Sequence, residues 1–296
     1  MTNRPPTPRA TLRRQLGGDE LIIAPGVFDG LSASITRRIG FAAAYLTGAG
    51  VAASGFGLPD IGLLTQTEMA ERARVLVSVL GDLPLIADAD TGYGAPINII
   101  RTVREYEAAG VAAIQLEDQA FPKKCGHLPD KELIGAEEFV VNLHAALDAR
   151  IDPELVVIAR TDSRGPLGID AAISRANTYA EAGADVIFVE APQGIDEINL
   201  IAKEVTAPLL INLVLGGLTP FESAQRLQDL GYRIAIHPSA ALGAAAVSMV
   251  AALAQIADKD PLQWLPSNPG EFFNLVNLAE WSALGESYRR DPAGKS

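Results

Sequence analysis

The segment Ala108-Ala109-Gly110-Val111-Ala112-Ala113-Ile114-Gln115-Leu116-Glu117 joins a helix end to a glycine, an apolar run and a terminal carboxylate. Glycine just past a helix accepts the left-handed conformation that closes it, and the apolar run that follows is typical of a buried strand. The same signature recurs at Gly40, Gly183 and Gly231. The recurrence predicts a chain built from one repeated helix–strand unit.

Eight short runs are predicted to be strands, because a parallel strand covered on both faces is nearly continuous in apolar character. They are Leu21–Ala24, Ala43–Leu46, Leu85–Asp88, Ala113–Glu117, Val156–Arg160, Val186–Glu190, Leu209–Asn212 and Arg233–His237. Helical patterns lie between them, such as Ile99–Ala109 (after Asn98) and Ile169–Ala182. These units predict an α/β fold, a single (β/α)₈ TIM barrel over 1–296, with a loose arm at 1–10 and a helical extension at 266–296.

Composition excludes several classes of partner. The net charge of −12 argues against nucleic acid and against anionic membrane surfaces. A single cysteine allows no intrachain disulfide, and residues 1–10 lack the apolar core of a signal peptide, so a cytoplasmic protein is expected. The uncharged stretch Ile234–Ala257 is only weakly hydrophobic. It predicts a strand followed by a buried alanine-rich helix rather than a membrane span.

Polar residues end six of the predicted strands. They are Asp88, Glu117, Arg160, Glu190, Asn212 and His237. Side chains that merely left the core for solvent would be of scattered types, whereas these are potential metal ligands, cations and hydrogen-bonding groups. Because the carboxyl ends of barrel strands hold the active site, the set predicts one there.

The alternating carboxylates Asp88 and Asp90, together with Glu117, form a hard oxygen cluster. Such a cluster suits Mg²⁺, with Mn²⁺ as the alternative ion, better than zinc. Arg160 is a side chain that binds a carboxylate through two parallel hydrogen bonds. A divalent cation facing an arginine implies a small-molecule substrate with carboxylate or phosphonate groups.

The run Gly48-Ala49-Gly50-Val51-Ala52-Ala53 matches the dinucleotide-binding pattern but lacks its context. That pattern requires a helix to start at once, whereas Ser54-Gly55-Phe56-Gly57-Leu58-Pro59 follows. We predict an extended loop in which Thr47, Gly48 and Ala49 offer hydroxyl and backbone donors to an anion.

The only cysteine lies in Lys123-Lys124-Cys125-Gly126-His127. A lone cysteine is often a small core residue, but a glycine and three basic side chains do not suit burial. Neighbouring cations lower a thiol pKa. The segment therefore predicts a reactive Cys125 that serves as acid, base or nucleophile.

Four motifs together resemble the isocitrate lyase/phosphoenolpyruvate mutase superfamily, from about Leu21 to Leu253. They are Thr47-Gly48-Ala49-Gly50, Asp88-Ala89-Asp90-Thr91-Gly92-Tyr93-Gly94, Glu117-Asp118-Gln119 and the cysteine segment. The Cys-Gly-His loop is similar to that of the methylisocitrate and 2,3-dimethylmalate lyase branch. The resemblance implies a TIM barrel whose last helix is exchanged between subunits of a dimer, within a tetramer that is a dimer of dimers. The apolar side chains of Glu271–Tyr288 could supply such a contact.

The resemblance also implies a role for each site residue. Asp88 and Asp90 would hold Mg²⁺, with Asp60 and Glu117 in its water shell. The residues that would hold the carboxylate end of a 2-hydroxy acid are Thr47, Gly48, Ala49, Gly126, Arg160 and Asn212, with Glu190 beside them. Cys125 would be the catalytic acid, and Lys123 and His127 would stabilise charge.

The implied reaction is a retro-aldol cleavage. Loss of the substrate's hydroxyl proton breaks the C2–C3 bond, which gives a 2-oxo acid and an enolate that Cys125 protonates. In the tricarboxylate-cleaving members of the superfamily an arginine follows the proline of the eighth strand, whereas here no arginine occurs between Arg233 and Arg289. We therefore predict a carbon–carbon lyase for an alkylated malate, accommodated near Leu242 and Gly243, rather than for 2-methylisocitrate. The alternatives are an oxaloacetate decarboxylase, an acylpyruvate or phosphonopyruvate hydrolase, and a barrel that binds carboxylates without turnover.

Overall fold

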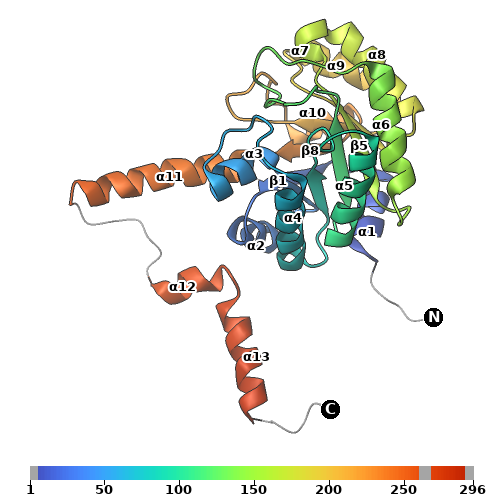
Figure 1. Cartoon of the computed structure of the whole chain (residues 1–296). Coiled ribbons are helices and arrows are strands. Elements are labelled where there is room, and N and C mark those ends of the chain that lie inside the picture. The colour runs from blue at the N-terminus through green and yellow to red at the C-terminus, as the bar shows by residue number, and fades with distance from the viewer. Residues whose placement is uncertain (1–5, 260–267, 291–296) are drawn as a thin grey trace.

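The computed structural model describes residues 6–259 and 268–290. Its strands close into a parallel barrel in chain order, and β8 pairs with β1 (Figure 1). The strands are β1 (Ile22–Val27), β2 (Ala44–Leu46), β3 (Leu85–Asp88), β4 (Ala113–Glu117), β5 (Val156–Thr161), β6 (Val186–Val189), β7 (Leu209–Asn212) and β8 (Tyr232–His237). The predicted (β/α)₈ barrel is confirmed.

Helices surround this sheet and follow its strands. They are α2 (Gly30–Ile39), α4 (Gln66–Leu80), α5 (Pro96–Ala109), α6 (Ala136–Ala149), α8 (Ile169–Glu181), α9 (Ile195–Glu204) and α10 (Ala224–Asp229), with the one-turn helix α7 (Arg164–Leu167) before α8. The four glycines of the repeated signature, Gly40, Gly110, Gly183 and Gly231, have φ of 89°, 95°, 100° and 92°, as predicted. Helix α5 begins at Pro96 rather than after Asn98, because proline suits the first helical turn.

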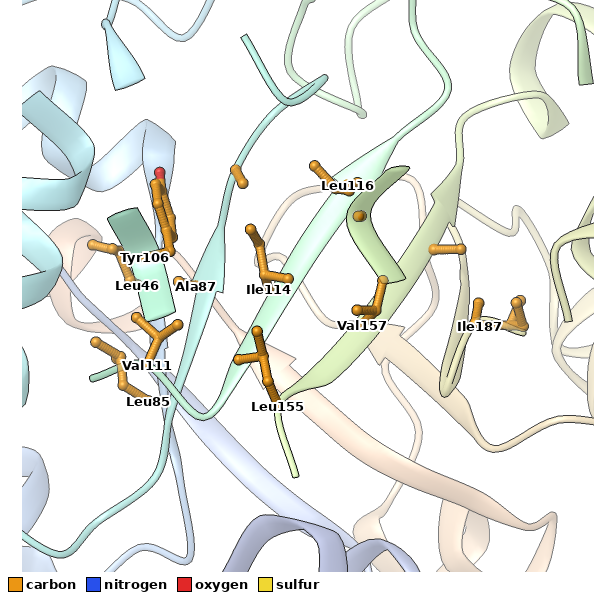
Figure 2. Packing of buried hydrophobic residues seen from close by; sticks show 14 of the residues in the cluster. Leu46, Leu85, Ala87, Tyr106, Val111, Ile114, Leu116, Leu155, Val157 and Ile187 are labelled. Carbon is orange, nitrogen blue, oxygen red and sulfur yellow. The ribbon is translucent and has the colours of Figure 1, made fainter. Parts of the chain in front are cut away.

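The strands alternate between two cores. Val156 and Ile158 of β5 point into the barrel with Phe188, whereas Val157 packs outward with Ile187. Figure 2 shows part of the outer cluster, in which strand residues meet helix residues such as Tyr106. Because the period of a strand is two, this phase directs the next residue in the series, Arg160, into the barrel mouth.

Helix α1 (Pro8–Leu16) closes the amino end of the barrel. Thr7 caps it, and the fully buried Leu12 joins the inner cluster at the strand starts. Arg13 anchors the helix through an ion pair with Asp185 at 2.6 Å. The predicted loose arm is therefore wrong for residues 8–10, and residues 1–5 lie outside the described part.

Helix α11 (Ala240–Ala257) projects from the barrel (Figure 1). The prediction of a buried helix is wrong for this chain alone, because no residue of α11 is buried and Val247, Val250 and Leu253 are exposed. By length and composition alone α11 could cross a membrane, but one such helix is weak evidence for a membrane span. Leu242 in its first turn lines a cavity at the barrel.

The C-terminal segment returns to helix α2. Helices α12 (Pro269–Asn274) and α13 (Leu278–Arg290) lie below α2 in Figure 1, apart from the helices that cover the barrel, and the Ser34 hydroxyl of α2 donates to the Leu275 carbonyl at 2.6 Å. The helical extension predicted for 266–296 is helical at 269–274 and 278–290; residues 266, 267 and 291–296 lie outside the described part.

We expect Leu12→Ala to lower the free energy of unfolding by about 2–5 kcal/mol, because it leaves a cavity where the barrel closes. Arg14→Ala, at an exposed position of the same helix, is the control. Denaturant unfolding of both variants checks this, and equal stability would show that α1 does not support the barrel.

Candidate active site

A cavity of about 140 Å³ opens at the carboxyl end of the barrel. The predicted site residues that line it are Thr47, Ala49, Asp60, Asp88, Lys123, Cys125, Gly126, His127, Arg160, Glu190 and Asn212. Gly48, Asp90 and Glu117 do not line it but contact residues that do. The residues that sequence reasoning missed are Tyr45, Gly50, Val214, Pro238 and Ser239.

Asp88 lies at the inward position that ends β3 and is held by three donors. These are the backbone N–H groups of Gly48 and Asp90, each at 3.2 Å, and the Gln115 side-chain amide at 3.3 Å. Burial raises the pKa of Asp88 to about 6, and the neighbouring Asp90 carboxylate adds to the rise. Asp90 has φ of 49°, a left-handed conformation that aspartate tolerates better than most residues.

The chemistry of this donor set fits Mg²⁺. Two buried carboxylates converge, and both side-chain oxygens of the neighbouring Glu117 are buried without a hydrogen bond. Among residues 6–259 and 268–290, no three Asp, Glu, His or Cys side chains form a complete ligand set. Mg²⁺ binds proteins through one or two carboxylates and fills its other positions with water and substrate, so the pair suffices.

Lys123 lies between two of the acidic side chains. Its ammonium is 2.5 Å from Asp60 Oδ1 and 2.8 Å from Asp90 Oδ1. Although burial opposes the charge, Asp90 and the other carboxylates raise the pKa of Lys123 well above its usual value. The positive charge of Lys123 thus directly offsets the negative charges of Asp60 and Asp90.

Arg160 is surrounded by carboxylates. Its Nε and Nη2 bind Asp162 at 2.8 and 3.0 Å, and Glu117 and Glu190 each lie 3.3 Å from one Nη atom. Asp162 therefore occupies the Nε–Nη2 edge, and a substrate carboxylate would approach the Nη1–Nη2 end, beside Glu117 and Glu190. Sequence reasoning missed Asp162, although the period of β5 continued past its end places residue 162 on the same side as Arg160.

The cysteine loop folds over Arg160. The Cys125 N–H donates to the Asp60 carbonyl at 3.1 Å, and a Cβ added at Gly126 would lie 2.5 Å from Glu190 Cγ. Only glycine therefore allows this close approach. Burial raises the pKa of the half-buried Cys125 thiol, so the prediction of a lowered pKa is wrong. At neutral pH Cys125 is a protonated thiol.

His127 is neutral in this environment, because burial lowers its pKa. Its Nδ1 accepts from the Leu218 N–H at 3.0 Å, which assigns the proton to Nε2, 3.5 Å from Glu190 Oε1. His127 can therefore donate a hydrogen bond without carrying a full charge. Asn212 donates to Glu190 Oε2 at 3.1 Å and completes this wall.

Two local predictions are wrong. Residues 48–56 form a short helix, α3 (Gly48–Val51), and the π-helical turn η1 (Ala52–Phe56) instead of an extended loop, because Thr47 caps the helix through Gly50 N–H. His237 lies outside the cavity, since the inward phase of β8 is set by Ile234 and Ile236. The His237 ring lies 6.3 Å from that of Phe221.

Comparison with known proteins identifies the family of the chain. The family model for phosphoenolpyruvate phosphomutase matches residues 12–257. The chain belongs to this family. It is 46% identical to the 2,3-dimethylmalate lyase of Eubacterium barkeri over 275 residues, which is 93% of each chain. It is 45% identical to a 2-methylisocitrate lyase of Bacillus subtilis (strain 168) over 234 residues, 79% of this chain and 76% of the relative.

Solved structures place the chain in the same superfamily. A 2,3-dimethylmalate lyase has a TM-score of 0.92 at 38% identity, with 99% of this chain and 100% of that chain covered. An oxaloacetate acetylhydrolase bound to 3,3-difluorooxalacetate scores 0.91 at 34% identity (95% and 97% covered). A phosphonopyruvate hydrolase with oxalate and Mg²⁺ scores 0.84 at 31% identity (96% and 99% covered). The predicted superfamily is confirmed, and the lyases among these relatives support the predicted carbon–carbon lyase class.

We expect the alkylation rate of Cys125 by iodoacetamide to reach half its maximum at a higher pH than that of a cysteine model peptide. Only the thiolate reacts, and a raised pKa keeps the thiol protonated to higher pH. A pH series of alkylation rates, read by mass spectrometry, checks this. A midpoint below that of the peptide would restore the original prediction of a low-pKa thiol.

Proposed function

We propose that this protein is a Mg²⁺-dependent carbon–carbon lyase that cleaves a 2-hydroxydicarboxylate, such as 2,3-dimethylmalate, to pyruvate and a carboxylic acid. The observation that carries the proposal is one cavity lined by Asp88 of the buried Asp88–Asp90 pair, by Arg160 and by the protonated thiol of Cys125. Binding of an anion needs the first two features, and protonation of a carbon needs the third. The relatives named as lyases support the same class.

Asp88 and Asp90 would hold Mg²⁺ directly, and Asp60 and Glu117 would bind its waters. When bound, Mg²⁺ would lower the pKa of the substrate's α-hydroxyl group and neutralise part of the charge on its carboxylate. The Nη1–Nη2 end of Arg160 would hold one substrate carboxylate. Thr47, Gly48 and Ala49 would shape the opposite wall, although the Gly48 N–H is engaged by Asp88.

The bond-breaking step leaves electrons on C3 of the substrate. A base, for which the cavity offers the Glu190 carboxylate, would take the hydroxyl proton. The O–H electron pair would then form the C2 carbonyl of pyruvate, and the electron pair of the C2–C3 bond would form an enolate of the departing acid. Cys125 would donate its Sγ proton to C3 of that enolate. Its raised pKa keeps this proton in place until the enolate forms, as a general acid requires. The Nε2–H of His127, which lies beside Glu190, and the ammonium of Lys123, which lies beside Asp90, would stabilise the negative charge of the enolate.

A hydrolase of a 2-oxo acid is the second candidate, because an oxaloacetate acetylhydrolase and a phosphonopyruvate hydrolase share the fold closely. The apolar wall of Val214, Pro238 and Leu242 favours the lyase, since it suits alkyl substituents. A carboxylate-binding barrel without turnover remains the third hypothesis.

We also propose a cytoplasmic homo-oligomer, a dimer of dimers in which the C-terminal helices are exchanged between subunits. The exposed apolar side chains of α11 and α13, which include Val250, Leu253 and Trp281, support it because an isolated chain would leave them in water.

Chelation should abolish turnover, and Mg²⁺ or Mn²⁺ should restore it. Asp90→Asn should also abolish turnover, because asparagine keeps the left-handed backbone but removes a charged ligand. Asp130→Asn is a matched control, since Asp130 also has positive φ (57°) but does not line the active-site cavity. Full activity in excess EDTA would exclude the metal assignment.

Cys125→Ser should reduce lyase turnover by at least ~10²-fold, because a hydroxyl is too weak an acid at neutral pH. Binding of oxalate, measured by calorimetry with Mg²⁺, should persist because it depends on Arg160 and the acidic pair. Normal turnover of the best substrate by this variant would favour the hydrolase.

Pyruvate release from 2,3-dimethylmalate, 2-methylisocitrate and oxaloacetate tests the substrate class. We expect kcat/KM for the alkylmalate to exceed that for the tricarboxylate by ~10²-fold or more, because a third buried carboxylate would lack a free cation. Leu242→Arg should narrow the gap since Leu242 lines the cavity. Gly243→Arg is the control, because the neighbouring Gly243 does not line the cavity and has no atom within 4 Å of its Cβ position. A preference of the unmodified protein for the tricarboxylate would contradict the proposal.

A further inference from the structure

A lysine and an aspartate that the proposed reaction does not use lie directly behind the cysteine loop. Lys131 Nζ donates to the Gly126 carbonyl at 2.5 Å and to Asp162 Oδ1 at 2.8 Å. Both residues are buried. Because a buried charge is costly unless it is paired, these contacts hold the two side chains in fixed positions.

Asp162 binds two cations at once. Its carboxylate accepts from Arg160 Nε and Nη2 as well as from Lys131. The Arg160 guanidinium, and after it the Lys131 ammonium, hold the pKa of Asp162 at about 2 against the effect of burial. Its backbone N–H donates to Asp118 Oδ1 at 2.9 Å, which fixes its place at the end of β5. One rigid carboxylate thus connects Arg160 to Gly126 through Lys131.

The loop has open space on its far side. A second cavity of about 620 Å³ is lined by the loop residues 126–131 together with Gly165, Pro166, Gln193 and Leu218. Packing from outside therefore does not press Gly126 onto the site. Specific contacts such as Lys131 to the Gly126 carbonyl and Cys125 N–H to the Asp60 carbonyl must hold it there.

We propose that Lys131 and Asp162 are positioning residues that set the cysteine loop and the Arg160 guanidinium together through one shared carboxylate. Lys131 fixes the Gly126 carbonyl and so the adjacent Cys125, and Asp162 fixes the edge of Arg160 that faces away from the substrate. The inference rests on the proposed function in that Cys125 and Arg160 act on the same substrate.

Alkylation of Cys125 at one fixed pH, without substrate, tests the loop contact independently of activity. Lys131→Met should raise the rate ~10-fold or more, because loss of the charged donor raises the population of the open loop. Lys124→Met is the matched control, since Lys124 belongs to the same loop and its ammonium donates to the carbonyl of the exposed Asp130 at 2.8 Å. It should stay within ~2-fold of the parent rate.

Kinetics with the best substrate separate the two roles. Lys131→Met should lower kcat more than it raises KM, because the thiol is misplaced, whereas Asp162→Asn should chiefly raise KM, because Arg160 is loosened. If the protein turns over none of the proposed substrates, the proposed function fails and the alkylation rates alone judge the positioning role.

Three outcomes would overturn the inference. One is a parent-like alkylation rate in folded Lys131→Met. Another is an alkylation rate that rises in every variant in proportion to the fall in its melting temperature, which would show that Lys131 and Asp162 have a purely structural role. If Lys131→Met does not fold, Asp162→Asn decides, since it removes the charge that holds Lys131. It should then be alkylated at least ~3-fold faster than the parent, and an unchanged rate would refute the proposal.

Discussion

Charge balance at the mouth of the barrel is the constraint on which the site depends. Six carboxylates converge there with three cations, and nearly all are buried. The carboxylates are Asp60, Asp88, Asp90, Glu117, Asp162 and Glu190, and the cations are Lys123, Lys131 and Arg160. Burial raises the pKa values of Asp88 and Glu117, and the neighbouring carboxylates add to the rise. A divalent cation at the Asp88–Asp90 pair would offset most of the excess of negative charge, so the same arrangement that binds an ion also limits where an anionic substrate can enter.

The barrel makes this concentration of charge possible because its strands have a fixed phase. Apolar residues such as Ile86 and Ile158 fill the interior below, and the next inward positions of their strands carry Asp88 and Arg160. Asp88, Glu117 and Arg160 are thus held by strands whose other residues pack on both faces. The cost of burying the charges is offset by that packing, which explains how the rim tolerates left-handed Asp90 and Ala191.

The sequence predicted the barrel, the four glycine-closed helices and most of the lining of the cavity, because these depend on local signals at strand ends. It failed for His237, since a strand that is apolar on both faces does not reveal its phase. The prediction that α11 is buried was wrong, because apolar composition predicts that a surface will be covered but does not show whether the same chain covers it. Asp162 was missed although the period of β5, continued past its end, indicates its inward position. Lys131 was missed because its importance comes from a contact with Asp162 that no local pattern contains.

The thiol pKa shows most clearly why sequence neighbours mislead. Three lysines lie near Cys125 in the chain, but each is committed elsewhere: Lys123 to Asp60 and Asp90, Lys124 to a carbonyl, and Lys131 to Asp162. His127 is neutral. None of these lysines is left to stabilise a thiolate, so burial decides and the proton stays on sulfur. This arrangement does not suit a nucleophile, because nucleophilic attack needs the thiolate. A general acid that must keep its proton until a carbanion forms is well served, and for that reason the structure favours the acid role among the three that the sequence allowed.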